Sequence, residues 1–389
     1  MMKLVPYGRQ EINQADIDAV TAVLQSDFLT QGPAVPAFES AVAAYCGAQH
    51  AIAVNSATSA LHIACLALGV GDGDIVWTSP NTFVASSNCA LYCGATVDFV
   101  DIDPRTYNLS LERLAEKLVL AQQSGRLPKV VIPVHLCGQA CDMAGIHALS
   151  QQYGFRIIED ASHAIGGKYK NEPIGNCRFS DITVFSFHPV KIITTGEGGL
   201  AVTQDPKLAK AMRILRSHGV SSRPADMHAR PANEIWNYQQ IGLGFNYRMT
   251  DIQAALGLSQ MKRLDSYILK RHQLAARYDE AFRDLPLTRP WQHPDAFSSY
   301  HLYPIRIPKS DTGKTQRQVY DALMADGFNV NVHYIPVYRQ PYYESMGFKS
   351  GYCPAAESYY TETISIPMFP SLATTDQDRV IATLTRVMA

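Results

Sequence analysis

The feature that most constrains the fold is a regular alternation of short β-branched runs with helical stretches up to about residue 250. This alternation is typical of a mostly parallel sheet covered by helices on both faces. We expect strands at residues 51–54, 74–79, 96–101, 129–134, 155–160 and 181–187, with helices between them at 57–68, 82–92, 110–124 and 142–153. The sequence therefore predicts an α/β fold.

A different pattern begins at Thr250, which can cap a long helical stretch that is interrupted only by Gly257. The remainder predicts strands near 301–307 and 329–335, a helix near 314–325 and a C-terminal helix. A chain of 389 residues with 47% apolar composition is too large for one compact domain of the usual size. We therefore expect a large domain over 1–250, followed over 251–389 by an interdomain helix and a small α+β domain.

Charge and cysteine spacing exclude several classes of partner. The 34 Lys and Arg residues nearly cancel the 35 Asp and Glu residues, so we expect no nucleic acid and no anionic membrane surface as a partner. The N-terminus lacks the apolar core of a signal peptide, and no apolar run has membrane-spanning length, which predicts a cytoplasmic protein. The close pairs Cys89/Cys93 and Cys137/Cys141 have three intervening residues, so we expect buried, reduced thiols and no metal site.

The first candidate for chemistry is Lys191, in the segment SFHPVKIITTGEGG (186–199). It follows a buried-type strand and precedes a glycine-rich turn that lets the backbone pass close to a ligand. Desolvation beside apolar strand ends lowers the pKa of an amine, and a neutral amine can attack an aldehyde to form a Schiff base. Taken alone, Lys191 is more simply a solvated loop lysine, and its neighbours decide in favour of the functional interpretation.

Asp160 is the second candidate, because it ends a strand at the carboxyl edge, where open α/β sheets bind ligands. A buried carboxylate there favours a cation. The ring nitrogen of pyridoxal phosphate (PLP) is one, since it must stay protonated for the ring to act as an electron sink. The alternative is that Asp160 caps a following helix. Glu159 alternates to the opposite face and is expected to be structural.

A phosphate site is expected at the helix start NSATSA (55–60). Exposed backbone N–H groups and the helix dipole suit a phosphate there, as does the hydroxyl of Thr58. Ser186 can add a second hydroxyl from the end of the strand that precedes Lys191. The alternative is plain helix capping, because Ser and Thr cap many helices that bind nothing.

Phe83 begins the helix after the second expected strand, where its ring can cover the face of a pyridine ring or pack in the core. Three histidines near these elements are expected to be structural instead of catalytic: His135, His163 and His188.

Four segments in matching order, SFHPVKIITTGEGG, EDASHAIGG (159–167), NSATSALH and GFNYRMTDIQAALGLSQ (244–260), resemble the sugar aminotransferases of the DegT/DnrJ/EryC1/StrS group over essentially the whole chain. The resemblance implies a fold type I PLP-dependent aminotransferase, a homodimer with shared active sites, and covalent attachment of the cofactor to Lys191. It assigns Asp160 to the pyridinium, Ala57, Thr58 and Ser186 to the phosphate, Phe83 to the ring face, and Asn246 to the phosphate of the partner subunit's cofactor. Arg248 and His333 are assigned to carboxylate and hydroxyl groups of the donor or substrate.

Within this group, residues 79–103 and 329–343 resemble the enzymes of pseudaminic acid biosynthesis. That similarity implies amination of a UDP-linked 4-keto-6-deoxy amino sugar at C4, with L-glutamate as donor. Relatives that dehydrate the sugar carry histidine in place of the lysine, so Lys191 favours transamination. Arg9 and the loop 26–33 are candidates for the UDP, with a plain surface role as the alternative.

Two other functions stay open at this point. The first is amination of another nucleotide keto sugar, such as the one that yields UDP-4-amino-4-deoxy-L-arabinose. The second is a non-catalytic protein that binds PLP or a nucleotide sugar without turnover.

Overall fold

The computed structural model describes residues 4–229, 233–234, 236–308 and 313–388. Its largest element is a seven-stranded sheet with the order β2-β10-β9-β6-β5-β3-β4. The strands are β2 (His50–Val54), β3 (Ile75–Thr78), β4 (Thr96–Phe99), β5 (Val130–Ile132), β6 (Arg156–Asp160), β9 (Ile182–Ser186) and β10 (Gly199–Thr203). All six expected strands are present, and those from β4 to β9 run parallel. The sequence reading missed β10, which is antiparallel to both β2 and β9.

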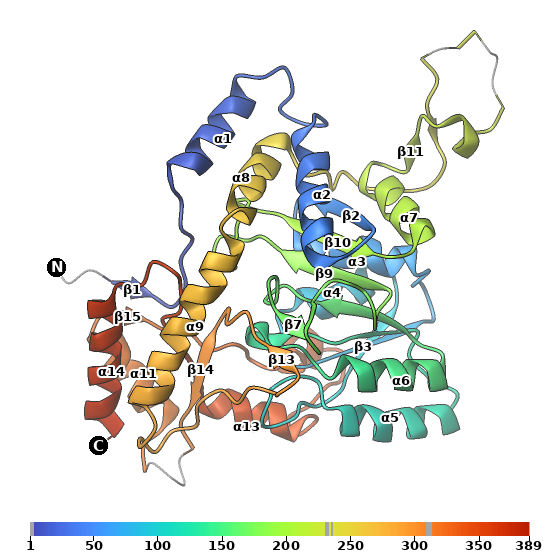
Figure 1. Cartoon of the computed structure of the whole chain (residues 1–389). Coiled ribbons are helices and arrows are strands. Elements are labelled where there is room, and N and C mark those ends of the chain that lie inside the picture. Colours follow the sequence, from blue (N-terminus) through green and yellow to red (C-terminus); the bar gives the residue numbers. More distant parts are fainter. Residues whose placement is uncertain (1–3, 230–232, 235, 309–312, 389) are drawn as a thin grey trace.

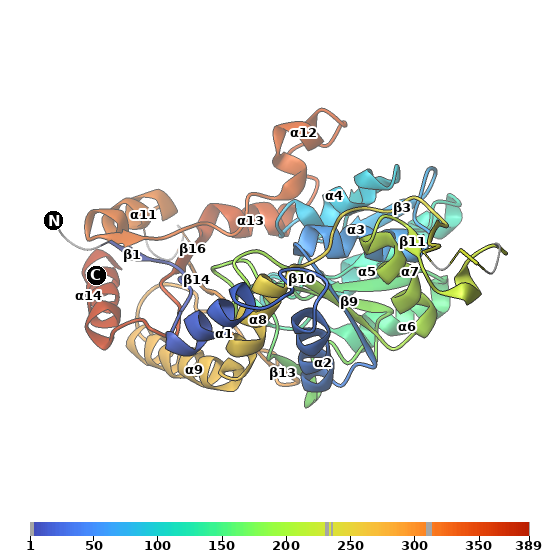
Figure 2. The ribbon, with the colours of Figure 1, turned by 90° about the horizontal axis from the view of Figure 1, so that it is seen from above.

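Helices cover both faces of this sheet, as predicted (Figure 2). One apolar cluster packs α2 (Ala34–Cys46), α5 (Leu111–Gln123) and α6 (Met143–Tyr153) on one face. A second cluster packs α3 (Ala57–Ala67), α4 (Ala85–Tyr92) and α7 (Pro206–Arg216) on the other. The expected helix at 82–92 starts three residues late, at Ala85, so Phe83 lies in the turn before α4 and does not begin it.

The single long helix expected from Thr250 is wrong, because the structure has two helices there. Thr250 does cap α8 (Asp251–Met261), in a capping box with Gln253, and α9 (Leu264–Ala281) follows after a break. The break falls at Lys262 and Arg263 and not at Gly257. A Cβ on Gly257 would lie 2.7 Å from Thr195 and 2.8 Å from Phe38, so this glycine serves close packing inside α8.

A third apolar cluster gathers elements from both ends of the chain. It contains α9, α11 (Gln316–Ala325), α14 (Thr374–Met388) and the antiparallel pair β14 (Tyr303–Arg306) and β16 (Thr363–Ile366). The N-terminal strand β1 (Val5–Pro6) pairs in parallel with β15 (Phe328–Asn329), beside α14 and α11 (Figure 1). The beginning of the chain is therefore packed against its last quarter.

The strand expected at 329–335 is wrong beyond Asn329. After β15 the chain turns to the loop before α4, where the N–H of Tyr334 donates to Asn81 Oδ1 (3.2 Å) and that of Val337 donates to the Pro80 carbonyl (2.9 Å). Because these N–H groups bond to a loop, the apolar alternation of this segment does not build a strand. The segment instead forms a wall near the carboxyl edge of the main sheet.

The remaining elements are short or peripheral. They are α1 (Gln14–Leu24), β7 (Lys168–Tyr169), β8 (Glu172–Pro173), β11 (Val220–Ser221), β12 (Gln239–Gln240), β13 (Ala296–Phe297), α12 (Pro341–Glu344) and α13 (Pro354–Glu362), with 3-10 turns at Leu136–Gly138, Pro224–Asp226 and Val337–Arg339. All eight cysteines are free, and seven of them are buried. Among the described residues, the helices are all too short or too polar to cross a membrane.

Candidate active site

Lys191 lies in a tightly closed loop between β9 and β10, at the carboxyl edge of the parallel strands. The N–H of Phe187 donates to the Gly198 carbonyl (2.9 Å), and the N–H of Thr195 donates back to the Phe187 carbonyl (3.0 Å). The N–H of Lys191 itself donates to the His188 carbonyl (2.9 Å). These bonds fix the backbone from which the lysine side chain extends.

The amine of Lys191 is easier to deprotonate than that of an ordinary lysine. Desolvation lowers its pKa to about 8, although the nearby carboxylate of Asp160 partly opposes the shift. The lowered pKa expected from the sequence is therefore present, and it makes a neutral, nucleophilic amine accessible close to physiological pH.

Asp160 ends β6 and is buried, with both carboxylate oxygens engaged. Oδ1 accepts from the N–H of Ser162 (3.0 Å), and Oδ2 accepts from the hydroxyl of Ser86 (2.6 Å). The chain continues from Asp160 through turns into β7, so the alternative that this aspartate caps a helix is wrong.

Glu159, on the opposite face of β6, is saturated by donors. It accepts from His135 Nε2 (2.7 Å), from Thr183 Oγ1 (3.1 Å) and from Ser180 Oγ. The Nδ1 of His135 accepts from the N–H of Cys141 (3.2 Å), so the ring carries its proton on Nε2 and donates it to Glu159. Both residues are structural, as expected.

The residues expected at the phosphate meet around Gly199. This glycine pairs with Ser186 across β9 and β10, and a Cβ on it would lie 2.3 Å from the backbone nitrogen of Ala57. Only glycine allows β10 to pass so close to the start of α3, where Ser56 is the N-cap and the N–H of Ser59 donates to its hydroxyl (3.1 Å). The structure thus brings Ser186 to the helix start that contains Ala57 and Thr58.

Phe83 has 60% of its surface exposed, so the core-packing alternative is wrong. Its ring lies 6.5 Å, centroid to centroid, from that of Tyr334. The preceding residues Asn81 and Thr82 are buried, which anchors the turn that presents the ring. An exposed aromatic ring on an anchored turn is suited to cover a flat ligand.

Three buried histidines lie close to Lys191: His163, His301 and His333. Burial lowers the pKa of all three, to about 3 for His333, and the charge of Lys191 lowers them further. They are therefore neutral near physiological pH. His163 Nδ1 accepts from the N–H of Cys137 (3.2 Å), so its proton is on Nε2, which lies 3.3 Å from the hydroxyl of Tyr334. By contrast, His188 is exposed.

His333 and Arg9 reach the same region from distant parts of the chain. The Nδ1 of His333 lies 2.8 Å from Ser365 Oγ, and its ring packs edge-on against Tyr7 at 4.9 Å. The next residue, Gly8, passes the lysine loop so closely that a Cβ on it would lie 3.7 Å from the Cβ of Val190. Arg9 follows with an exposed side chain.

Asn246 and Arg248 lie on a segment that runs antiparallel to the end of β2, where Arg248 bridges to Val54. The backbone carbonyl of Asn246 lies 3.5 Å from Asn55 Nδ2, and its side chain is exposed. Asn246 does not cap α8, because Thr250 is the N-cap of that helix. Within the described ranges, no carboxylate forms an ion pair with Arg248.

Sequence reasoning missed Ser86, Tyr334 and His301 as neighbours of these residues. Ser86 carried one usable signal, since it follows Phe83 by three residues on the same helix start. The other two come from the C-terminal third of the chain, and no sequence pattern links them to the lysine loop.

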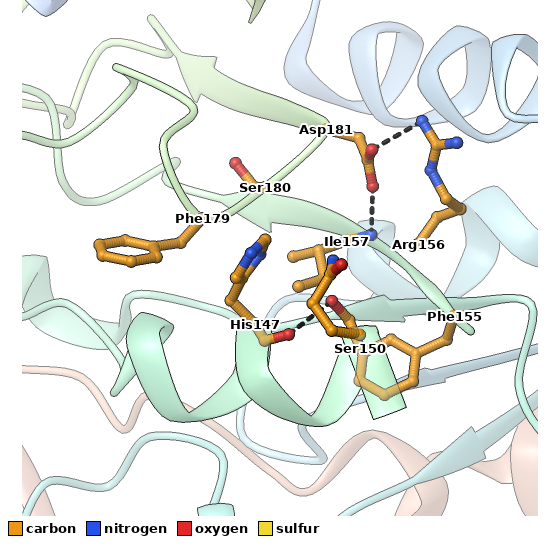
Figure 3. A pocket seen from close by; sticks show the side chains of 9 residues that line it. His147, Ser150, Phe155, Arg156, Ile157, Phe179, Ser180 and Asp181 are labelled. Atoms are coloured by element: carbon orange, nitrogen blue, oxygen red, sulfur yellow. Dashed lines mark hydrogen bonds and ion pairs between the residues drawn. The ribbon is translucent and has the colours of Figure 1, made fainter. Parts of the chain in front are cut away.

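A separate pocket lies at the opposite, amino edge of the sheet, between α6 and the starts of β6 and β9 (Figure 3). Its polar groups already bond to one another. Arg156 pairs with Asp181 (2.6 Å), which also accepts from the N–H of Ile157 (2.8 Å), and the hydroxyl of Ser150 donates to the carbonyl of His147 (2.8 Å). This pocket is therefore not the candidate active site.

At the carboxyl edge, by contrast, the amine of Lys191, with its lowered pKa, lies near the carboxylate of Asp160, which two hydrogen bonds hold in place. The start of α3 is at the same edge, where Gly199 leaves room beside the backbone of Ala57. This arrangement fits the aldehyde, ring nitrogen and phosphate of PLP, and with the doubly covered sheet it defines a fold type I PLP-dependent aminotransferase. The particular family follows from the sequence. Residues 10–385 match the DegT/DnrJ/EryC1/StrS aminotransferase family, and the chain belongs to it.

Similar proteins cover almost the entire chain. The spore coat polysaccharide biosynthesis protein SpsC of Bacillus subtilis is 41% identical over 381 residues, which are 97% of this chain and 95% of that protein. The UDP-4-amino-4,6-dideoxy-N-acetyl-beta-L-altrosamine transaminase of Campylobacter jejuni is 36% identical over 387 residues, covering 99% and 98%. Among solved structures, Helicobacter pylori PseC, an aminotransferase involved in the biosynthesis of pseudoaminic acid, has a TM-score of 0.89 and 31% identity, covering 99% of both chains.

The family fixes the activity class and the cofactor. The protein is a sugar aminotransferase, and its cofactor is PLP; similar chains have been solved in PLP and PMP forms.

Proposed function

We propose that this enzyme transfers the amino group of L-glutamate to C4 of a UDP-linked 4-keto-6-deoxy amino sugar, forming UDP-4-amino-4,6-dideoxy-N-acetyl-beta-L-altrosamine for pseudaminic acid biosynthesis. The observation that carries this substrate is the end-to-end similarity to the Campylobacter transaminase and to PseC. SpsC has a higher sequence identity to this chain than the Campylobacter transaminase has, but its name specifies spore coat polysaccharide biosynthesis and no sugar.

In this proposal Lys191 is the catalytic residue. PLP, when bound, supplies the electron sink that makes the donor's Cα–H acidic. Lys191 Nζ would hold the cofactor covalently, and as a free amine it would take the proton from the donor's Cα. A pKa of about 8 leaves enough neutral amine for this transfer near physiological pH. Asp160 keeps the proton on the ring nitrogen, and Phe83 covers the ring face.

The same proposal assigns the phosphate to Ser186, to the N–H groups of the α3 start at Ala57 and Thr58, and to the hydroxyl of Thr58. The approach of β10 to α3 at Gly199 supports these assignments.

For the substrates, Arg248 is assigned to the carboxylate of glutamate, because a guanidinium without a carboxylate partner among the described residues can bind one in a bidentate way. His333, held neutral, is assigned to sugar hydroxyls. Arg9, exposed beside the lysine loop, is assigned to the diphosphate of UDP.

We further propose a cytoplasmic homodimer in which Asn246 completes the partner subunit's site. Three large apolar side chains shortly before Asn246 are strongly exposed, namely Trp236 (73%), Tyr238 (68%) and Leu243 (80%). An exposed apolar group of this kind favours burial against a second subunit. The two-domain division at residue 250 also stays part of this proposal.

The substrate is tested by offering the PLP-loaded enzyme glutamate together with the UDP-linked 4-keto-6-deoxy amino sugar, or with the UDP-4-keto pentose that leads to 4-amino-4-deoxy-L-arabinose. Mass spectrometry should detect replacement of the keto oxygen by an amine on the first sugar and not on the second. Preferential amination of the pentose would contradict the substrate assignment. If the enzyme binds PLP but glutamate does not bleach its visible absorption, the assignment of glutamate as the amino donor is contradicted.

A further inference from the structure

The carboxylate of Asp160 is held by a residue far away in sequence. The hydroxyl oxygen of Ser86, in the first turn of α4, lies 2.6 Å from Asp160 Oδ2, and both side chains are buried. An ionised carboxylate can only accept, so Ser86 is the donor. The same hydroxyl lies 3.3 Å from the Phe83 carbonyl, but the shorter contact to a charged acceptor is the stronger one.

The hydroxyl of Ser86 is itself in contact with a second hydroxyl, that of Thr82. Thr82 Oγ1 lies 2.7 Å from Ser86 Oγ, and Thr82 is also buried. Since the single proton of Ser86 is donated to Asp160, the proton between the two hydroxyls belongs to Thr82. The three side chains therefore form one directed chain from Thr82 to Ser86 to Asp160, in surroundings where water does not compete.

Together with the N–H of Ser162, this chain fixes both oxygens of the Asp160 carboxylate from two separate elements. Each oxygen keeps a further lone pair for another donor. We infer that Ser86, oriented by Thr82, is a positioning residue that aligns the Asp160 carboxylate with the ring nitrogen of PLP. The inference rests on the proposed pairing of Asp160 with that nitrogen.

The inference has a direct electrostatic consequence. Without the Ser86 hydroxyl, the Asp160 carboxylate is held from one side only, by the N–H of Ser162, so it can turn away from the ring nitrogen. A carboxylate that is less well aligned stabilises the positive charge of the ring nitrogen less, so the ring would lose positive charge. With less positive charge nearby, the lysine nitrogen linked to the cofactor should release its proton at a higher pH.

The test is a pH titration of the visible absorption of the PLP-loaded enzyme, together with the rate of PLP loss on dilution. Ser86→Ala should raise the titration midpoint by roughly 0.5 to 1 pH unit and speed PLP loss by up to about tenfold. Thr82→Val, which keeps the shape and removes the hydroxyl, should shift the midpoint less in the same direction. Ser86→Thr should restore the wild-type midpoint.

Ser87→Ala is the matched control. Ser87 is a buried serine of the same helical turn, but its hydroxyl lies 2.6 Å from the hydroxyl of Tyr343 and makes no bond to Asp160. The control removes the same atom from the same helix and should leave the midpoint unchanged.

The outcomes separate the inference from the function on which it rests. If Asp160→Ala shifts the midpoint but neither Ser86→Ala nor Thr82→Val does, the positioning role is overturned and the Asp160 assignment stands. If Asp160→Ala also leaves the midpoint unchanged, the proposed pairing with the ring nitrogen fails. Should Ser86→Ala not fold, the midpoint of Thr82→Val decides alone.

Discussion

The two faces of β6 end in two adjacent carboxylates with opposite environments. Glu159 accepts from three side chains, His135, Thr183 and Ser180, and is closed off on its side of the sheet. Asp160 accepts from one hydroxyl and one backbone N–H, and it faces Lys191 without a direct ion pair among the described residues. The first arrangement stabilises the fold, and the second leaves charge available to a ligand. Whether a buried carboxylate stabilises the fold or binds a ligand thus depends on how many of its lone pairs are left free by donors from the protein.

The strongest test of this contrast removes the cation on the Asp160 side. Lys191→Ala should lower turnover by about 10⁴-fold or more and abolish the visible absorption of the lysine-linked cofactor, because the covalent link and the proton carrier are lost together. Steady-state rates and absorption spectra measure both effects. Lys170→Ala, which removes an exposed lysine from the turn between β7 and β8, should leave the rate near wild type. Retained turnover in Lys191→Ala, without added amines, would overturn the assignment.

The second test compares the two acids directly. Asp160→Ala should reduce turnover by about a hundredfold or more and weaken PLP binding, with little change in the stability of the cofactor-free protein. Glu159→Gln should do the reverse and cost roughly 2 to 4 kcal/mol of unfolding free energy, since a buried carboxylate with three donors is neutralised. Urea unfolding and kinetics on each variant measure the two effects. If both variants lose activity and stability equally, the contrast between the two faces is wrong.

The smallest expected effect concerns completion of the site by a second subunit. Lys191→Ala and Asn246→Asp proteins, each inactive alone, should regain about a quarter of wild-type activity when mixed and allowed to exchange. Half of the dimers are then mixed, and each has one site with both natural residues. The backbone of Asn246 lies near Asn55 of its own subunit, so a role within one subunit is the competing expectation. Exchanged dimers that show no recovery would support that role.

The sequence predicted the parallel strands well because both of their faces are buried, which produces nearly continuous apolar, β-branched runs. Strand β10 was missed because its short run, GLAVT, directly continues the glycine-rich turn after Lys191, and no turn residue separates the two. At 329–335 an apolar alternation misled the prediction, because Asn331 makes an isolated bridge to Ser365 of β16 and the N–H of Tyr334 then bonds to Asn81 in the loop before α4.

Within the site, motifs located Lys191, Asp160 and the residues expected at the phosphate, since each stands at the end of a predictable strand or at the start of a predictable helix. The contacts that hold them were not readable. Ser86 meets Asp160 across 74 residues of sequence. Such a pairing depends on how strands are ordered in the sheet, and no local pattern of the sequence encodes that order.

The pairing of β1 with β15 means that the main sheet can form earlier during synthesis than the complete site. The seven strands of the main sheet all lie within residues 50–203. Val5, by contrast, pairs with Phe328, so β1 cannot form its strand pair until residue 328 has been synthesised. The wall containing His333 and Tyr334 follows immediately after. On a ribosome, the emerging chain can thus build its sheet and its lysine loop long before the N-terminal segment is anchored beside them. The site can therefore be completed only after the segment around Phe328 has been synthesised.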